Sequence, residues 1–241
     1  MIESKGLELR DYDSVPLGKN LEVCSVTPIP KSEWRDRIAD HETNKTRPLD
    51  IHLQNAVPIL NQQSLKYCWV FACVAGIQNR LAYMGIDPVP ELSAACVGSI
   101  FKKGRNVGGY AEQGARACLN GVPDASYWAN SKLKNAGFDF DNSDAHKNVL
   151  AKFTELRPYA IGDAMSVLLS DDPKPIVFAL PWWRHAVCIL AACYEDKQFG
   201  FHYVNSYGSK WGNQGFGTIL GDKTKAHEMI VCDSILARAE Q

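Results

Sequence analysis

The chain has 241 residues, of which 46% are hydrophobic and 22% are charged, with 26 basic against 27 acidic side chains. The apolar fraction excludes a disordered protein, and a formal net charge of −1 gives no electrostatic basis for binding nucleic acid or an anionic membrane. We therefore expect a single globular protein, a monomer, that binds no nucleic acid.

Two segments bear on targeting and membranes. The first eleven residues interrupt every short apolar run with a charge, so they cannot form the apolar region of a secretory signal. The most apolar window, residues 175–194, approaches membrane-spanning length but holds Pro181, Arg184 and His185 near its middle. We expect two buried strands there, no membrane partner and a cytoplasmic location, which by analogy would suit a bacterial or phage-type protein.

Residues 1–49 are rich in charged side chains and contain four prolines, which predicts an extension ahead of the main fold. Within it, Ser32 stands in N-cap position before a helical pattern that ends at His41 and places Trp34 and Ile38 on one face. We interpret the extension as an arm packed on the body, with a short pro-segment or regulatory segment as the alternative.

The rest of the chain changes from helical to strand-like texture. The strongest helical pattern spans residues 68–83, with Gly85 as its C-terminal cap, and shorter patterns cover 92–101, 111–119 and 161–169. Strands are predicted at 176–180, 185–194, 198–204, 216–220 and 229–235. This order predicts an α+β fold with a mainly helical half (50–160), a mainly antiparallel β half (161–241) and a site in the cleft between them.

The eight cysteines allow disulfides, a metal site or a catalytic thiol. Cys68 stands apart because it begins the strongest helix, and a helix N-terminus lowers the pKa of a thiol. Gln62, in the polar loop before it, could donate to a developing oxyanion together with the backbone N–H of Cys68. No Cys-x-x-Cys pair is present, so we expect no metal and no cofactor, and we interpret the other seven cysteines as reduced packing residues.

A thiolate needs a base, and the base needs a group that holds its ring. His185 begins one predicted strand and Asn205 follows the next, with a tight turn between the two strands. The two side chains therefore meet at one sheet edge, where the Asn205 amide oxygen can accept a hydrogen bond from the imidazole N–H. Cys, His and Asn in these roles form a recognised variant of the catalytic triad.

Four blocks of sequence carry a resemblance to a known family. They are the nucleophile block Gln62-Gln-Ser-Leu-Lys-Tyr-Cys68-Trp69 with Glu91-Leu-Ser93 downstream, the glycine pair in Asn106-Val-Gly108-Gly109-Tyr110, the histidine strand His185-Ala-Val, and the block Asn205-Ser-Tyr-Gly208-Ser-Lys-Trp211-Gly212. In this order they resemble the papain-like cysteine peptidases over roughly residues 50–235. The resemblance implies an α+β fold with a helical half and an antiparallel, β-barrel-like half.

The resemblance also implies roles for individual residues. Cys68 would attack a peptide carbonyl, His185 would transfer protons as general base and acid, Asn205 would orient His185, and Gln62 would bind the oxyanion. The expected activity is that of a cysteine-type peptidase, in particular an endopeptidase, that acts on a polypeptide substrate through a thioester.

Further residues would support the substrate or the site. Gly108 and Gly109 would offer backbone hydrogen bonds to an extended substrate, Trp69 would support the nucleophile, and Trp211 would shield the contact between Asn205 and His185. We expect Trp183, just ahead of the histidine, to narrow the pocket for the substrate residue two before the cut. A Trp183→Ala variant should therefore change the cleavage profile of a peptide library.

The chain departs from the family at several positions. Leu65 and Asn106 occupy the places where secreted members carry a disulfide, and the loss of both cysteines fits a reducing compartment. Tyr207 stands where an indole is usual. The extension also lacks the long helical pattern of the family's inhibitory propeptide. Two alternative functions remain: a catalytically silent papain-fold protein that binds peptides or has a structural role, and another thiol acyl transferase or amidase.

Overall fold

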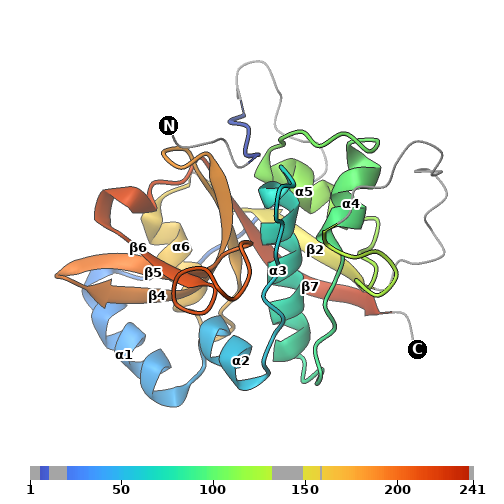
Figure 1. The fold of residues 1–241 in the computed structure, drawn as a ribbon. Coiled ribbons are helices and arrows are strands. Elements are labelled where there is room, and N and C mark those ends of the chain that lie inside the picture. Colours follow the sequence, from blue (N-terminus) through green and yellow to red (C-terminus); the bar gives the residue numbers. More distant parts are fainter. Residues whose placement is uncertain (1–5, 11–20, 132–148, 158, 239–241) are drawn as a thin grey trace.

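A single seven-stranded sheet and six α-helices make up the part of the chain that the computed structural model describes, residues 6–10, 21–131, 149–157 and 159–238 (Figure 1). The sheet order is β1-β2-β7-β3-β4-β5-β6. The strands are β1 (Glu22–Val23), β2 (Val149–Glu155), β3 (Ile176–Leu180), β4 (His185–Glu195), β5 (Gln198–Val204), β6 (Phe216–Leu220) and β7 (Glu228–Arg238). The helices are α1 (Trp34–Asn44), α2 (Pro48–Gln54), α3 (Cys68–Tyr83), α4 (Ala94–Phe101), α5 (Ala111–Cys118) and α6 (Ile161–Leu168). The predicted α+β fold is confirmed.

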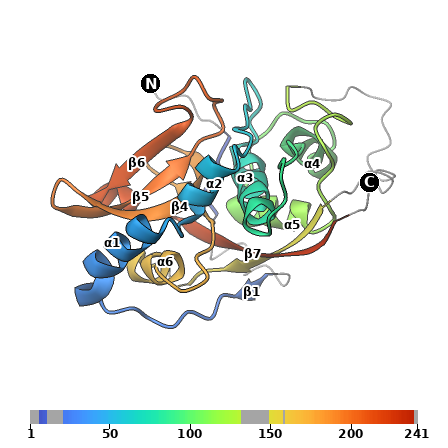
Figure 2. The ribbon, with the colours of Figure 1, turned by 90° about the horizontal axis from the view of Figure 1, so that it is seen from below.

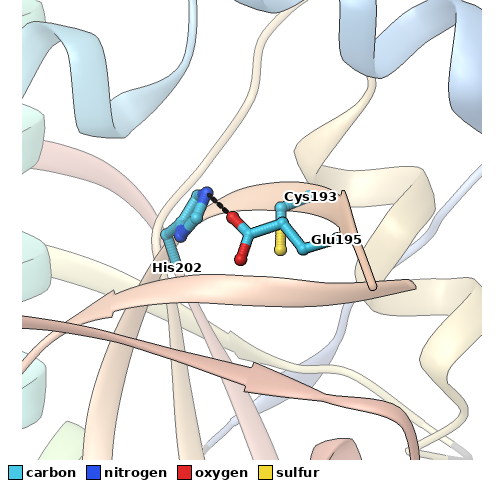
Figure 3. Close-up of side chains that lie close together, drawn as sticks. All are labelled: Cys193, Glu195 and His202. Atoms are coloured by element: carbon cyan, nitrogen blue, oxygen red, sulfur yellow. Dashed lines mark ion pairs between the residues drawn. The ribbon is translucent and has the colours of Figure 1, made fainter. Parts of the chain in front are cut away.

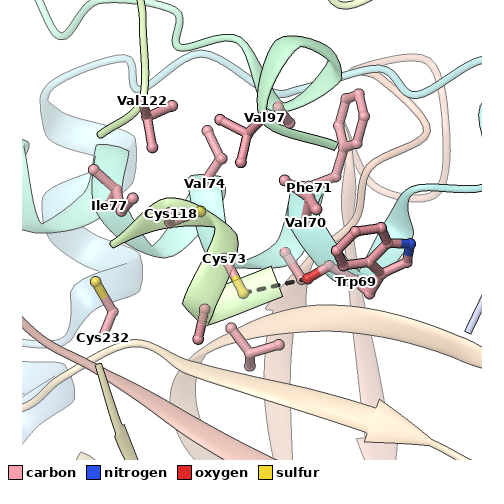
Figure 4. Close-up of a cluster of buried hydrophobic side chains, with 14 of the residues drawn as sticks. Trp69, Val70, Phe71, Cys73, Val74, Ile77, Val97, Cys118, Val122 and Cys232 are labelled. Carbon is pink, nitrogen blue, oxygen red and sulfur yellow. Dashed lines mark hydrogen bonds between the residues drawn. The ribbon is translucent and has the colours of Figure 1, made fainter. Parts of the chain in front are cut away.

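Helix α3 is the centre of the larger core. Its bounds match the prediction, and Gly85 follows it with φ of +80°, in the left-handed region that favours glycine. In Figure 4, Val74 and Ile77 of α3 lie toward Val97 and Val122, and Cys73 donates a hydrogen bond to the Trp69 carbonyl at 3.2 Å. Figure 1 places α3, α4 and α5 on one side of the molecule and β4, β5 and β6 on the other.

The apolar window at residues 175–194 forms the predicted pair of buried strands. β3 pairs antiparallel with β4 from Ile176 opposite Ile189 to Leu180 opposite His185, and every residue of β3 is buried. Among the described residues, no helix is both long and apolar enough to cross a membrane.

Strand β2 lies in the stretch where the sequence predicted only helices and loops. It pairs antiparallel with β7 along its whole length, and β7 extends beyond the predicted strand at both ends. Val149, Ala151 and Phe153 of β2 are buried, whereas Lys152 projects to the surface and pairs with Glu22 of β1. A strand from the middle of the chain therefore belongs to the sheet, next to β7.

Helix α1, which belongs to the segment that the sequence predicted to be an arm, lies beside α6 in Figure 2. A 3-10 turn at Lys31–Glu33 precedes α1, so Ser32 lies inside this turn and does not cap the helix, which corrects the prediction. Trp34 and Ile38 share the buried face as predicted, and the Trp34 ring meets Phe199 edge-on at 5.1 Å.

Candidate active site

The ends of two neighbouring strands bring the candidate base and its orienting group together. β4 begins at His185, β5 ends at Val204, and Cys188 of β4 lies opposite Val204, so Asn205 is held next to His185. The His185 Nε2 lies 2.7 Å from the Asn205 Oδ1, and because that oxygen can only accept, Nε2 carries the proton. His185 is fully buried and Asn205 is 2% exposed. The contact is therefore shielded from bulk water.

The candidate nucleophile lies next to the start of β4. Cys68 is the first residue of α3 and is fully buried, and its sulfur accepts hydrogen bonds from the backbone N–H groups of Ala186, Trp69 and Cys68 itself. Ala186 directly follows His185. Burial raises the pKa of the Cys68 thiol to about 12 because a thiolate would lose its hydration, and the three N–H groups lower this pKa only in part. In this arrangement the predicted depression of the pKa by the helix N-terminus is outweighed.

The loop before α3 connects the candidate oxyanion donor to the asparagine block. The Gln62 N–H donates to the Ser206 carbonyl at 2.8 Å, and the Ser206 hydroxyl donates to Gln62 Oε1 at 2.6 Å. Gln62 Nε2 donates one hydrogen to the Leu65 carbonyl at 2.6 Å. The side-chain amide is thus held by two fixed partners, and Ser206 directly follows Asn205.

Aromatic rings surround His185. The Tyr207 ring stacks on the imidazole at 4.7 Å with an interplanar angle of 28°, and the Trp183 ring lies 4.6 Å from it. Trp211 stacks on Trp183 at 6.0 Å and meets Tyr207 edge-on at 5.9 Å. Trp183 therefore packs against the rings that cover the histidine, and its influence on the substrate site stays a prediction.

The hydroxyl of Tyr207 is a feature that the sequence analysis missed. It lies 3.3 Å from His185 Nδ1, the nitrogen that would exchange a proton with Cys68, and it donates to that nitrogen because Nε2 holds the ring proton. The replacement of the usual indole by tyrosine was visible in the sequence. The contact between the Tyr207 hydroxyl and His185 Nδ1 depends on how the tyrosine ring stacks on the imidazole, which the sequence does not specify.

The glycine pair and Trp69 form the wall beside α3. Trp69 is buried, and its indole N–H donates to the Lys66 carbonyl at 3.0 Å. A Cβ on Gly109 would lie 2.7 Å from the Trp69 ring, so only glycine fits there. The backbone of Gly109 already pairs with the chain's own Leu7. Gly109 thus presents its backbone to an extended segment, here one from the N-terminus, and a Cβ on Gly108 would lie 2.5 Å from the Gly6 carbonyl oxygen.

All eight cysteines are free thiols, and the segments that a family disulfide would join are held in another way. Asn106 Oδ1 accepts the Lys66 N–H at 2.7 Å, and Asn106 Nδ2 donates to the Ser64 carbonyl at 3.2 Å. Leu65 between them is buried. One asparagine side chain therefore connects the loop before the nucleophile to the glycine pair.

We expect Asn106→Ala to destabilise the protein by about 1 kcal/mol, because two solvent-accessible hydrogen bonds are lost and no buried group is orphaned. Urea unfolding measures this cost, and the Lys66 amide should exchange with solvent faster. Val107→Ala, a partly exposed neighbour, is the control and should leave both quantities unchanged. Unchanged exchange at Lys66 in Asn106→Ala would show that the side chain does not hold the loop.

A group of three potential metal ligands lies elsewhere on the sheet. Cys193, Glu195 and His202 have their ligand atoms within 4.8 Å of one another. Figure 3 shows the three side chains, with the ion pair between His202 and Glu195 as a dashed line. Burial raises the pKa of the Cys193 thiol to about 12, which opposes the thiolate that a metal needs. Cys193 lies eight positions after His185 on β4, roughly 26 Å away at the usual strand rise. This group therefore takes no part in the candidate active site.

In fold the chain is similar to several solved cysteine protease precursors. Digestive procathepsin L 3 of the Tenebrio molitor larval midgut aligns with a TM-score of 0.61 and 15% identity over 74% of this chain and 67% of its own. Procathepsin L2 from the same source aligns with a TM-score of 0.60 and 16% identity. The alignment covers 96% of this chain and 75% of procathepsin L2. The proform of Amb a 11, a ragweed pollen cysteine protease, aligns with a TM-score of 0.60 and 14% identity. The alignment covers 78% of this chain and 66% of the Amb a 11 chain.

No protein-family model and no curated protein sequence matches the chain. At 14–16% identity, the likeness to solved structures concerns the fold, and it confirms the predicted papain-like α+β architecture.

Proposed function

We propose that the protein is a cysteine-type peptidase that cleaves peptide bonds through a thioester acyl-enzyme. The observation that carries the proposal is the 2.7 Å contact between His185 Nε2 and Asn205 Oδ1, next to the Ala186 N–H that donates to the Cys68 sulfur. A nucleophile, a base and a group that orients the base thus converge from one helix and two strands.

In the proposed reaction the proton of the Cys68 thiol passes to His185 Nδ1, and the thiolate attacks the carbonyl carbon of the substrate. The oxyanion accepts hydrogen bonds from Gln62 Nε2 and the Cys68 backbone N–H. His185 gives its proton to the leaving amine as the C–N bond breaks and a thioester remains. Water then attacks the thioester while His185 takes its proton, and the acid product leaves as the thiol re-forms.

The experiment that tests the proposal combines labelling and turnover. A peptidyl epoxide that alkylates thiolates should label the full-length protein once, at Cys68, and unfolded casein should be cleaved. Labelling without cleavage of any polypeptide would contradict the peptidase and favour a thiol acyl transferase or amidase. Neither labelling nor cleavage would favour the catalytically silent peptide-binding protein.

We expect Tyr207→Phe to raise kcat/KM between about two- and tenfold, the range that a net neutral hydrogen bond supports. The hydroxyl donates to the neutral Nδ1 of His185 and so favours the uncharged imidazole, whereas the attacking state needs the imidazolium. Because the thiol has the higher pKa of the two groups, His185 sets the acidic limb of the pH–rate profile, and this limb should move to higher pH.

Tyr203→Phe is the matched control for this prediction. The Tyr203 ring contacts Trp211 and Trp183, and Tyr203 makes no hydrogen bond to His185 that the described structure records. Its variant should keep the wild-type profile. If the acidic limb stays in place in Tyr207→Phe, then the hydroxyl does not influence the base.

A further inference from the structure

A short N-terminal segment, residues 6–10, lies along the glycine pair; we call it the strap. Leu7 forms a parallel bridge with Gly109, the Gly109 N–H donates to the Gly6 carbonyl at 2.9 Å, and the Glu8 N–H donates to the Gly109 carbonyl at 2.9 Å. Leu7 is buried in the larger core cluster. Both hydrogen-bonding groups of Gly109 are therefore satisfied by an extended peptide that happens to belong to the same chain.

The strap ends by placing a cation between two buried acids. The Arg10 side chain has no exposed area, and its Nη1 lies 3.6 Å from Glu155 Oε1 and 4.0 Å from Glu228 Oε1. We call Glu155 and Glu228 the acidic pair. The His227 Nε2 also donates to the Arg10 carbonyl at 2.8 Å. The Arg10 guanidinium thus lies in a site closed to water, and the Arg10 carbonyl is held by His227.

The acidic pair is not saturated by Arg10. A charge-assisted N–H···O bond is usually about 2.7–2.9 Å long, so both contacts to Nη1 are longer than a good ion pair. Glu228 is fully buried, and its Oε1 accepts no hydrogen bond from the residues that the structure describes. Glu155 differs, because Arg157 and Tyr159 also bind its carboxylate. Glu228 is therefore the member that a better-placed cation would satisfy.

The two oxygens of Glu228 have separate partners. Oε2 accepts the Ala111 N–H at the start of α5 at 2.9 Å, which is a structural role as a helix cap. Oε1 faces Arg10 and leaves the cap intact when its partner changes. Burial raises the pKa of the Glu228 carboxyl to about 7 even though the nearby charge of Arg10 lowers it, so Arg10 where it lies leaves this carboxyl only partly ionised at neutral pH.

The sheet register places this site next to the candidate catalytic residues. Glu228 of β7 lies opposite Ala179 of β3, and Ala179 lies opposite Ala186 of β4. Ala186 follows His185 and donates to the Cys68 sulfur. The acidic pair and the Gly109 backbone therefore flank the nucleophile, and one peptide can reach both of them, as the strap does.

We propose that the acidic pair is the recognition site for an arginine or lysine side chain of the polypeptide substrate, and that Arg10 is its resident occupant, which the substrate must displace. This inference rests on the proposed peptidase function. Glu155 keeps Arg157 when Arg10 leaves, but a buried Glu228 carboxylate without a cation is costly, so the site stays filled either by the strap or by a basic side chain of the substrate. A substrate with a neutral side chain at this position should bind more weakly, because it displaces Arg10 without supplying a cation to Glu228.

The binding test uses the full-length chain with Cys68→Ala, so that no peptide is cleaved, and with Arg10→Gln, so that the strap loses its cation. The probes are two acetylated, amidated pentapeptides: Gly-Leu-Glu-Leu-Arg, the sequence of the strap, and Gly-Leu-Glu-Leu-Gln. We expect calorimetry to show at least tenfold tighter binding of the arginine peptide. Adding Glu228→Gln, which can still accept the Ala111 N–H, should reduce the preference below threefold.

Glu112→Gln is the matched control, because Glu112 is a buried acid in the first turn of α5 that pairs with Arg116 instead. It should leave the preference intact. Equal binding of the two peptides, or a preference that survives Glu228→Gln, would overturn the inference.

A second measurement needs no change at Arg10. The wild-type protein should cleave a peptide library with at least a tenfold preference for arginine or lysine at one position, and Glu228→Gln should abolish that preference. Cleavage without a basic preference would refute the recognition site but leave the peptidase standing. If the protein binds the arginine peptide more tightly than the glutamine peptide but Cys68 is not labelled by the epoxide, then the peptidase is refuted and recognition of a basic side chain still stands.

Discussion

Cys68→Ala is expected to abolish both peptide cleavage and epoxide labelling, with a loss of kcat on the order of 10⁵-fold or more, as when a catalytic nucleophile is removed from other triads. The methyl group cannot form a thioester, and Cys68 is the cysteine whose sulfur accepts the N–H of Ala186, the residue after His185. Cleavage of unfolded casein and mass spectrometry after labelling measure the two effects.

Cys73→Ala is the matched control, since this buried thiol lies five residues further along α3. Its sulfur contacts the Trp69 carbonyl, and burial raises its pKa well above the ordinary value, so it should neither react nor contribute to turnover. The variant should stay active and be destabilised by about 1 kcal/mol. Cleavage by Cys68→Ala, or loss of activity in Cys73→Ala, would show that the chemistry lies elsewhere.

The elements with a clear hydrophobic period could be predicted from the sequence. Helix α3 and strands β3, β5 and β6 have the expected bounds, because each is a run of apolar residues bounded by turn or capping residues. Strand β2 could not be predicted in this way. Its alternation of buried and surface residues is short, and its partner β7 is about eighty residues away, so only the tertiary pairing reveals it.

The types and order of the candidate catalytic residues were accessible from the sequence, but their environment was not. The meeting of His185 and Asn205 follows from a hairpin, which is a local feature. The pKa of Cys68 depends on how completely other segments cover it, and the helix N-terminus alone suggested the wrong direction. The contact of Arg10 with Glu228 joins residues from opposite ends of the chain, and no sequence pattern links them.

Gln62→Ala is the second variant for which we expect a large loss of kcat, and Gln62 too depends on a residue far away in the sequence, Ser206. The side chain is the proposed donor to the oxyanion, and loss of one such donor lowers kcat by roughly 10²- to 10³-fold with little change in KM, because the bond forms in the transition state. Steady-state kinetics on a peptide substrate measure both parameters. An exposed neighbour, Gln63, provides the control variant Gln63→Ala, which should behave as wild type.

A second pair of variants separates donation by Gln62 from its structural contacts. Gln62→Glu keeps an oxygen for the Ser206 hydroxyl but loses the amide donor, so its kcat should fall as far as that of Gln62→Ala. Ser206→Ala keeps the donor and loosens its orientation, so a smaller loss, about tenfold, is expected. If Gln62→Glu retains wild-type kcat while Ser206→Ala does not, then Gln62 acts by holding the loop next to Asn205 and not by stabilising the oxyanion.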